Sequence, residues 1–274
     1  MRARWFVIFL VAAFPVASAA PRCLRDARAD CSGVECIPAY AHNDYRNAHP
    51  LLDALSLGFR GVEADVVLVD GELRVAHKRK EARPERTLEA LYLRALAERV
   101  ETCHGRVHDD PRPFLLNIEI KERDDAALTE LRRLLEKYRS MLTEMSAGQV
   151  HPGAVDVVLV GYRPTLSEIE QESPRYYRVQ VEIERPEDLA LPCRPDVVGF
   201  QSIDYGKRMR WWRRSKQESK YLAAIREAKQ AHPDCMIRVF NLSPDRARYE
   251  RSLGAGVDLI GTKEIERTRR ILAE

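Results

Sequence analysis

Residues 61–77 read GVEADVVLVDGELRVAH, and this stretch decides the fold. Its apolar and β-branched residues predict a buried strand over residues 61–69. The Asp70-Gly71 pair between two apolar runs is typical of a tight hairpin, so residues 73–77 are expected to return beside the first strand. Within that strand Glu63 and Asp65 lie two residues apart, and side chains at this spacing share one face.

Short β-rich runs of this kind alternate with helical stretches along the chain. The expected strands are Ala39–His42, Gly61–Val69, Leu73–His77, Pro113–Lys121, Val155–Val160, Tyr177–Ile183, Val197–Gln201, Met236–Phe240 and Leu259–Gly261. The expected helices are Pro50–Gly58, Arg86–Cys103, Ala126–Ser146, Thr165–Glu172, Trp212–His232, Pro244–Gly254 and Lys263–Glu274. This alternation predicts an α/β fold, and a strand count near eight favours a closed (β/α)8 barrel of the TIM type over an open doubly wound sheet.

The N-terminal residues differ in character from the rest of the chain. Arg2 and Arg4 precede an apolar run, and residues 17–19 are small, which is typical of a secretory signal peptide. The apolar run is shorter than the roughly 20 residues that a membrane span needs. We therefore expect a cleaved signal over residues 1–19, a cysteine-containing segment over residues 20–38, and a single barrel domain over residues 39–274. The protein would then be secreted or periplasmic, with an uncleaved anchor as the alternative.

The charge balance argues against a nucleic-acid partner. The chain has 45 Lys and Arg against 42 Asp and Glu, and loss of the signal would remove Arg2 and Arg4 and no acid. The exported chain would be close to neutral, so a basic character gives no reason to expect nucleic acid. We expect a monomer that acts on a small molecule or a phospholipid.

Six cysteines follow the expected signal, at positions 23, 31, 36, 103, 193 and 235. Export would make disulfides plausible, although the sequence does not choose among the possible pairings. A zinc site is the alternative interpretation of these cysteines, but no two of them have the usual Cys-x₂-Cys spacing.

Three acids interrupt apolar strands where a buried charge needs compensation. Glu63 and Asp65 share a face of one expected strand, and Glu119 and Lys121 share a face of another. Carboxylates that gather near strand ends suit a hard divalent cation such as Mg²⁺ or Ca²⁺. The alternative is a set of buried salt bridges.

Two histidines lie beside these acids along the chain. His42 ends the first expected strand and His77 ends the return strand of the hairpin. Imidazole exchanges protons near neutral pH, so both are candidate acid–base groups, although a structural hydrogen-bonding role is the alternative for either one. The five other histidines are expected at the surface.

Several of these segments together resemble a known superfamily. The segments are His42–Tyr45 (HNDY), Pro50–Leu55 (PLLDAL), Gly61–Val66 (GVEADV), Asp70–Leu73 (DGEL), Val75–His77 (VAH), Asn117–Lys121 (NIEIK) and Gly256–Thr262 (GVDLIGT). They are similar to the glycerophosphodiester phosphodiesterase and phosphatidylinositol-phospholipase-C-like superfamily, and most similar to its branch with a His-Asn-Asp motif. Asn43, Lys78 and Lys263 differ from the residues usual in glycerophosphodiesterases.

The resemblance implies a barrel enzyme that cleaves phosphodiesters with one divalent cation, Mg²⁺ or Ca²⁺. It implies that His42 and His77 are the acid–base pair, that the cation ligands are Glu63, Asp65 and Glu119, and that Lys121 holds the phosphate. We further predict substrate binding by Asn43, by Arg46, which could reach a phosphate oxygen, and by Gln201, which ends an expected strand. For Arg46 the alternative is an exposed loop charge.

These predictions lead to an exported phosphoric diester hydrolase that acts on a glycerophosphodiester or a phospholipid headgroup. One alternative is a barrel of weak or no activity that binds lipid or another surface. A metal-dependent barrel enzyme for sugars is a second alternative, but histidines beside the acids do not favour it. Trp211 and Trp212 lie among arginines, which suits contact with a membrane surface, although tryptophans packed on the barrel would give the same pattern.

Overall fold

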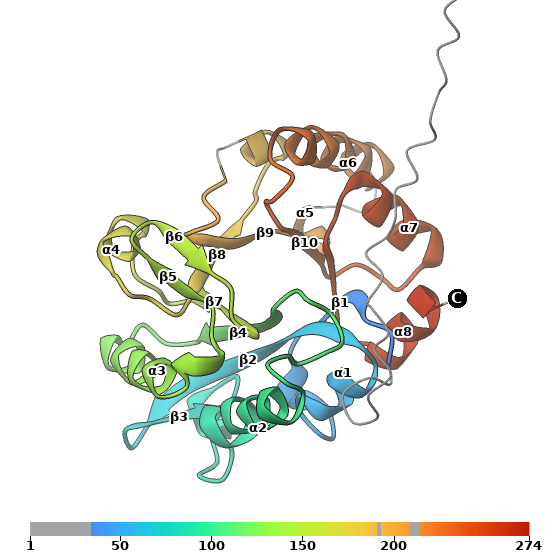
Figure 1. The fold of residues 1–274 in the computed structure, drawn as a ribbon. Coiled ribbons are helices and arrows are strands. Elements are labelled where there is room, and N and C mark those ends of the chain that lie inside the picture. Colours follow the sequence, from blue (N-terminus) through green and yellow to red (C-terminus); the bar gives the residue numbers. More distant parts are fainter. Residues whose placement is uncertain (1–33, 191–192, 209–213, 274) are drawn as a thin grey trace, which may run out of the picture.

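The structure is a computed structural model that describes residues 34–190, 193–208 and 214–273 (Figure 1). Eight parallel strands close into a barrel in the order β1-β2-β4-β7-β8-β9-β10-β11, and β11 pairs with β1. They are β1 (Ile37–Ala41), β2 (Phe59–Val69), β4 (Phe114–Ile120), β7 (Val155–Gly161), β8 (Arg178–Glu182), β9 (Val198–Asp204), β10 (Ile237–Phe240) and β11 (Leu259–Thr262). The predicted single-domain (β/α)8 barrel is confirmed.

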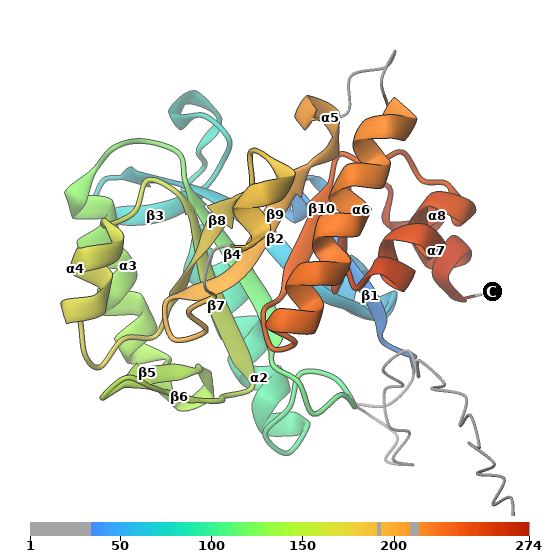
Figure 2. The ribbon, with the colours of Figure 1, turned by 90° about the horizontal axis from the view of Figure 1, so that it is seen from above.

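Helices surround the barrel on the outside (Figure 1), except for α5, which lies at one end of it (Figure 2). They are α1 (Leu52–Ser56), α2 (Arg94–Thr102), α3 (Asp125–Lys137), α4 (Leu166–Gln171), α5 (Tyr205–Arg208), α6 (Arg214–Ala231), α7 (Arg246–Ala255) and α8 (Ile265–Ala273). A π-helical turn, Glu89–Leu93, leads into α2, and a 3₁₀ turn, Pro186–Ala190, follows β8. In the described part of the chain, no helix is both long and apolar enough to cross a membrane.

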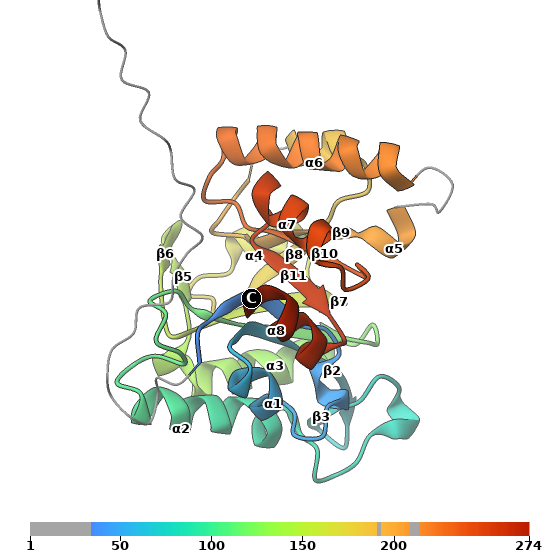
Figure 3. The same cartoon turned by 90° about the vertical axis from the view of Figure 1, so that its right-hand side faces the viewer.

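The predicted hairpin forms as expected. β3 (Glu72–Val75) runs antiparallel to β2, and the turn between them places Asp70 and Gly71 at positive φ. Figures 2 and 3 show β3 and α5 at one end of the barrel, and the β5–β6 hairpin at the opposite end. The end with β3 and α5 is therefore the end where the barrel strands finish.

Alternation along the strands divides the side chains between two environments. On β2, Val62, Ala64 and Val66 face outward and belong to the main apolar core with the covering helices. Inward-facing Leu115, Val158, Phe200 and Leu259 fill the lower barrel. The acids at odd-numbered positions of β2 therefore point into the barrel, above this apolar plug.

The prediction of one helix is wrong over the second half of its range. The helix predicted over residues 126–146 ends at Lys137, and residues 144–151 form a hairpin of β5 (Glu144–Ser146) and β6 (Gln149–His151). Ala147 and Gly148 both have positive φ, which is the backbone of a two-residue hairpin turn. The apolar spacing of the preceding helix continues through this segment and masked the turn.

One disulfide joins the loops before two strands of the second half of the barrel. Cys193 and Cys235 are bonded, and they precede β9 and β10. The expected signal peptide, Cys23, Cys31 and the Trp211-Trp212 pair lie outside the described residues. The expectation that all five remaining histidines are at the surface is wrong for His108, which is buried and contacts the Phe59 carbonyl oxygen through Nε2 at 2.9 Å.

Candidate active site

Three neighbouring strands of the barrel bring the predicted residues together at one end. β1 pairs with β2, and β2 pairs with β4 in a register that sets Asp65 beside Glu119. His42 directly follows β1, and its backbone N–H donates to the Thr262 carbonyl oxygen at 2.8 Å. The carboxyl ends of these strands therefore carry the candidate chemistry, as in other barrels of this type.

The three acids predicted as cation ligands converge. Glu63, Asp65 and Glu119 each offer a carboxylate oxygen, and these oxygens lie within 4.8 Å of one another. Glu63 and Asp65 are buried, and Glu119 is partly buried. A cation that binds oxygen at about 2.0–2.6 Å gathers its ligand oxygens within roughly 5 Å, so the spacing suits one such ion.

Neighbouring groups occupy one oxygen of each carboxylate. Glu63 Oε2 accepts a hydrogen bond from the Tyr40 hydroxyl at 2.9 Å. Asp65 Oδ2 accepts from Tyr45 at 2.8 Å. Glu119 Oε1 accepts from Lys121 Nζ at 2.8 Å. These contacts fix the orientation of the acids.

The remaining oxygens give an independent test of the cation. Glu63 Oε1 and Asp65 Oδ1 are buried and accept no hydrogen bond from the described residues. Burial, together with the charges of Asp65 and Glu119, raises the pKa of Glu63 to about 7 despite the lowering effect of Arg238. Because unpaired buried carboxylate oxygens are costly, the donor set fits a divalent cation that prefers oxygen.

His77 lies in direct contact with the acids. Its Nδ1 donates to Asp65 Oδ2 at 2.7 Å, and its side chain is 37% exposed, so the other ring nitrogen can face a ligand from solvent. Lys121 Nζ lies 3.5 Å from the same Asp65 oxygen. Although burial lowers the pKa of Lys121, the hydrogen bond to Glu119 and the charge of Asp65 raise it overall, so Lys121 is a cation at the site.

His42 lies on the other side of the acids. Its Nε2 is 3.4 Å from Glu63 Oε1, and its ring packs edge-on against Phe240 with centroids 5.5 Å apart. Burial and, after it, the charge of Arg238 lower the pKa of His42 to about 3. The structure thus brings together all five residues of the predicted chemical core.

The loop after β1 is shaped by a buried acid. Asp44 accepts hydrogen bonds from the backbone N–H of Leu51 at 2.6 Å and from the Tyr92 hydroxyl at 2.9 Å. Burial raises the pKa of Asp44 to about 6. Asn43, which we predicted to bind substrate, has a left-handed backbone (φ 57°) at the start of this loop. The His-Asn-Asp motif therefore includes one residue that holds the loop rather than the substrate.

The other predicted substrate-binding residues have different outcomes. Arg46 is exposed, and its guanidinium lies 5.7 Å from the centre of the Tyr45 ring, beside the site. Gln201 does not end a strand, and that prediction is wrong. β9 continues to Asp204, and a register shift near Gly199 places Gln201 on the face that carries Ile203, away from inward-facing Phe200.

A buried arginine beneath the acids was missed in the sequence. Arg238 lies on β10 with its Nη1 3.8 Å from Glu63 Oε2, and its guanidinium stands 4.4 Å from the Tyr40 ring centre and 4.5 Å from that of Phe240. It also donates to Gln180 Oε1 at 3.3 Å. The sequence signal for Arg238 was a charged residue inside the apolar run over residues 236–240. A strand with one exposed face has the same pattern, so the signal did not predict a buried arginine.

Asn117 is a second residue that sequence reasoning did not assign. It lies on β4 directly beside Glu63 of β2, two residues before Glu119 on the same face. The side chain is fully buried, and both its Oδ1 and Nδ2 atoms have no hydrogen-bond partner among the described residues. Its amide therefore belongs to the inner wall of the site.

Comparison with known sequences gives a family relationship. A sequence model described as the AIM6-like phosphodiesterase domain matches residues 28–178. Altered inheritance of mitochondria protein 6 of Eremothecium gossypii is 31% identical over 156 residues, which cover 50% of this chain and 40% of that protein. The Altered inheritance of mitochondria protein 6 homolog of Arthroderma benhamiae is 30% identical over 168 residues, covering 53% of each chain. The matched region is thus about half, or less, of these relatives.

Comparison with solved structures gives a more distant likeness. The crystal structure of a glycerophosphodiester phosphodiesterase from Agrobacterium tumefaciens str. C58 superposes with a TM-score of 0.48 and 15% sequence identity. The superposition covers 85% of this chain and 98% of that one. At this score the likeness carries no argument about function.

Proposed function

The chain belongs to the family of AIM6-like phosphodiesterase domains, and on this premise we propose that it is a metal-dependent phosphoric diester hydrolase. Its substrate would be a glycerophosphodiester or a phospholipid headgroup. The observation that carries the proposal is the contact of Asp65 with His77 at 2.7 Å, in a cluster where Glu63 and Asp65 each leave one buried oxygen unpaired. One cluster thus combines an oriented imidazole with a fitting site for a cation.

Asp65 would serve two purposes at once. Oδ2 accepts from His77 Nδ1, which leaves Nε2 of that ring as the atom that exchanges a proton with the substrate. A carboxylate in this position stabilises the protonated ring. We therefore assign the general acid, which protonates the leaving alcohol, to His77.

His42 would remove the proton from the attacking hydroxyl or water. It lies across Glu63 from the His77–Asp65 pair, so the two rings flank the acids. Lys121 would hold a phosphate oxygen and offset the charge that develops on it. The cation held by Glu63, Asp65 and Glu119, Mg²⁺ or Ca²⁺, would supply further charge neutralisation at the phosphate when bound.

Location and partners extend the proposal. Export by the signal expected over residues 1–19 would place the enzyme in the periplasm or outside the cell, where it would act as a monomer. Trp211 and Trp212 would provide peripheral contact with a membrane surface. These assignments rest on sequence, since the residues concerned lie outside the described part of the structure.

A substrate panel tests the proposal. Glycerophosphodiesters, phosphatidylinositol and sphingomyelin are incubated with the full chain, with added Mg²⁺ or Ca²⁺ and with excess chelator. We expect hydrolysis of at least one phosphodiester, and we expect chelation to stop it. Binding of lipid vesicles without hydrolysis of any substrate would favour the alternative of a surface-binding barrel, and full activity in chelator would remove the cation from the account.

A further inference from the structure

A cavity of about 540 Å³ opens beside the candidate active site. Glu119 and Lys121 line one side of this cavity. The remaining lining residues come from the end of β4 and the residues after it, and from the end of β7 and the loop after it. The loop includes Tyr162, Arg163 and Pro164. A ligand with its phosphodiester at Lys121 could therefore extend into this space.

Two arginines line this cavity without an ion pair to a described residue, the exposed Arg123 and the more deeply placed Arg163. Arg163 is half-buried, and its one hydrogen bond to a described residue is a long contact of 3.5 Å from Nη1 to the Pro164 carbonyl oxygen. No carboxylate of the described residues lies within ion-pair distance of it, and burial lowers its pKa. Glu122 in the same cavity is already paired with Arg79, at 2.5 Å. A guanidinium carries five N–H donors, so most of its binding capacity faces the cavity.

The loop that carries Arg163 is held in place by its surroundings. The backbone N–H of Tyr162 donates to the Ile120 carbonyl oxygen at 3.0 Å. Gly161 allows this approach, because it has a φ of 71° and a side chain there would come within 2.5 Å of the same oxygen. The Tyr162 hydroxyl also donates to Asp125 at the start of α3.

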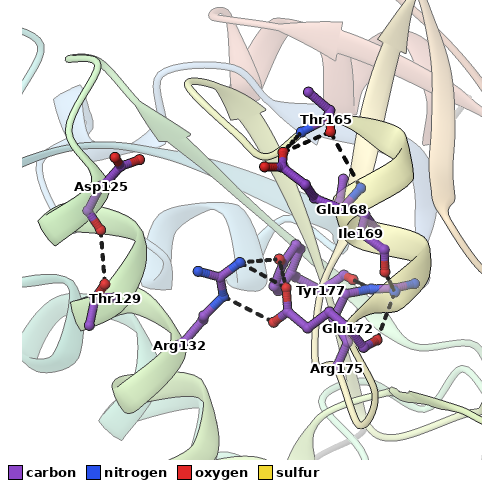
Figure 4. A network of polar contacts seen from close by, with 9 residues as sticks. All are labelled: Asp125, Thr129, Arg132, Thr165, Glu168, Ile169, Glu172, Arg175 and Tyr177. Carbon is purple, nitrogen blue, oxygen red and sulfur yellow. Dashed lines mark hydrogen bonds and ion pairs between the residues drawn. The ribbon is translucent and has the colours of Figure 1, made fainter.

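The helix that follows the loop is anchored as well (Figure 4). Thr165 and Glu168 form a capping box at the start of α4. Figure 4 shows Arg132 of α3 reaching Glu172 beyond the end of α4, a contact of 2.8 Å, and Tyr177 donating to the same carboxylate. Anchors on both sides of the loop make Arg163 a preorganised donor.

We infer that this cavity binds a second anionic group of the substrate, a carboxylate or a phosphate monoester on the headgroup, and that Arg163 is its main ligand. The inference rests on the proposed function for the position of the phosphodiester. Lys121 contacts Glu119 and Asp65 at the candidate active site, so we assign it to the reacting phosphate. The guanidinium of Arg163, which has no ion pair with a described residue, is available for another anion. Planar guanidinium groups bind carboxylate and phosphate through two parallel hydrogen bonds.

Matched substrate pairs test the inference by kinetics. Glycerophosphoserine differs from glycerophosphoethanolamine by a carboxylate, and glycerophosphoinositol 4-phosphate differs from glycerophosphoinositol by a phosphate. We expect the full chain to prefer the member with the extra anion, and we expect Arg163→Ala to reduce that kcat/KM ratio about 10-fold, the effect of losing one charged hydrogen-bonding partner. A preference in only one of the two pairs would identify whether the cavity binds a carboxylate or a phosphate. Arg163→Lys should keep part of the preference.

Arg133→Ala is the matched control, because Arg133 is an exposed arginine on α3 that pairs with Glu130 at 2.7 Å. It should have the wild-type ratios. If Arg163→Ala does not fold, as judged by its thermal melting, Arg163→Gln takes its place. Equal ratios in the wild type and in the uncharged Arg163 variant would overturn the inference.

Binding without turnover separates this inference from the proposed function. The same four compounds are titrated calorimetrically into the protein with His77→Ala, alone and combined with Arg163→Ala. Tighter binding of the anionic members that is lost with Arg163 would support the cavity even if no compound were hydrolysed, an outcome that would overturn only the proposed function. Hydrolysis of all four with affinities that do not depend on Arg163 would overturn the cavity alone.

Discussion

In the first half of the barrel, β2 and β4 carry the three candidate cation ligands, and His42 directly follows β1. In the second half, β9 and β10 contribute mainly from below the acids, through Phe200 of the apolar plug and the buried Arg238. The family match ends at residue 178, where β8 begins, so it follows the same division. The comparison suggests that the first half performs the chemistry, while the second half supports it by charge and packing.

The largest expected effect comes from the histidines of the first half. His77→Ala or His42→Ala should lower phosphodiester turnover by about 10²–10⁴-fold, because each removes one proton-transfer group. Neither residue belongs to the apolar core, so the thermal melting curve should change little. Turnover is measured on the best substrate of the panel, and an unchanged rate in either variant would remove that residue from the mechanism.

Arg238 tests the contribution of the second half. Arg238→Met leaves Glu63 buried without its partner cation, and loss of one member of a buried pair typically destabilises by about 3–5 kcal/mol. The free energy of unfolding is measured in urea. Arg133→Met, at an exposed site, is the control and should change stability by less than about 0.5 kcal/mol.

The double variant sharpens this result. With Glu63→Gln also present, the loss caused by Arg238→Met should shrink, because no uncompensated carboxylate remains. Losses that simply add would show that Arg238 acts through packing against Tyr40 and Phe240 rather than through Glu63.

The disulfide should affect stability without affecting chemistry. Cys193 and Cys235 lie before β9 and β10, at the end of the barrel opposite the site, and they close a loop across 42 residues. Replacing both by alanine should destabilise by about 2–4 kcal/mol and leave turnover at the wild-type level. A large loss of kcat in this variant, under conditions where it is folded, would contradict the division between the two halves.

A smaller effect is expected from acid titration of His108. Burial lowers its pKa to about 4, below the value of 6.5 for an unperturbed histidine. Between these values the unfolded chain binds a proton that the folded chain does not, so this group stabilises the fold fully above pH 6.5 and loses its contribution as the pH falls towards 4. The loss should be about 2–3 kcal/mol.

The contribution of His108 is measured from the pH dependence of the free energy of unfolding in urea. His108→Gln should flatten the curve between pH 6.5 and 4, whereas His151→Gln, at an exposed position on β6, should retain the wild-type slope. Parallel curves for all three proteins would show that His108 is not held in its neutral form by the fold.

The sequence was sufficient for the barrel and for the placement of the first-half site. Glu63, Asp65 and Glu119 were visible because carboxylates in β-branched runs conflict with burial unless something compensates them. The Asp70-Gly71 turn could be predicted because its residues strongly prefer the backbone conformation of a tight hairpin turn. Both signals depend on neighbours along the chain.

The remaining features depend on contacts between distant residues. The orientation of Gln201 follows from the register shift near Gly199, which arises in the pairing of β8 with β9. Arg238 and Asn117 become part of the site only when β10 and β4 bring them next to Glu63. No local pattern encodes those distances, so these residues looked like ordinary members of their strands.

The most direct test of the account is the binding of one divalent cation to the acids of the first half. Mn²⁺ is titrated into the metal-free protein and followed by electron paramagnetic resonance, with Mg²⁺ and Ca²⁺ as competitors. Asp204→Asn is the matched control, because Asp204 is a buried acid at the end of β9 on the other half of the barrel. We expect one site per chain, lost in Asp65→Asn and Glu63→Gln and kept in Asp204→Asn. Binding that survives in both first-half variants, or no binding to the wild type, would contradict this expectation.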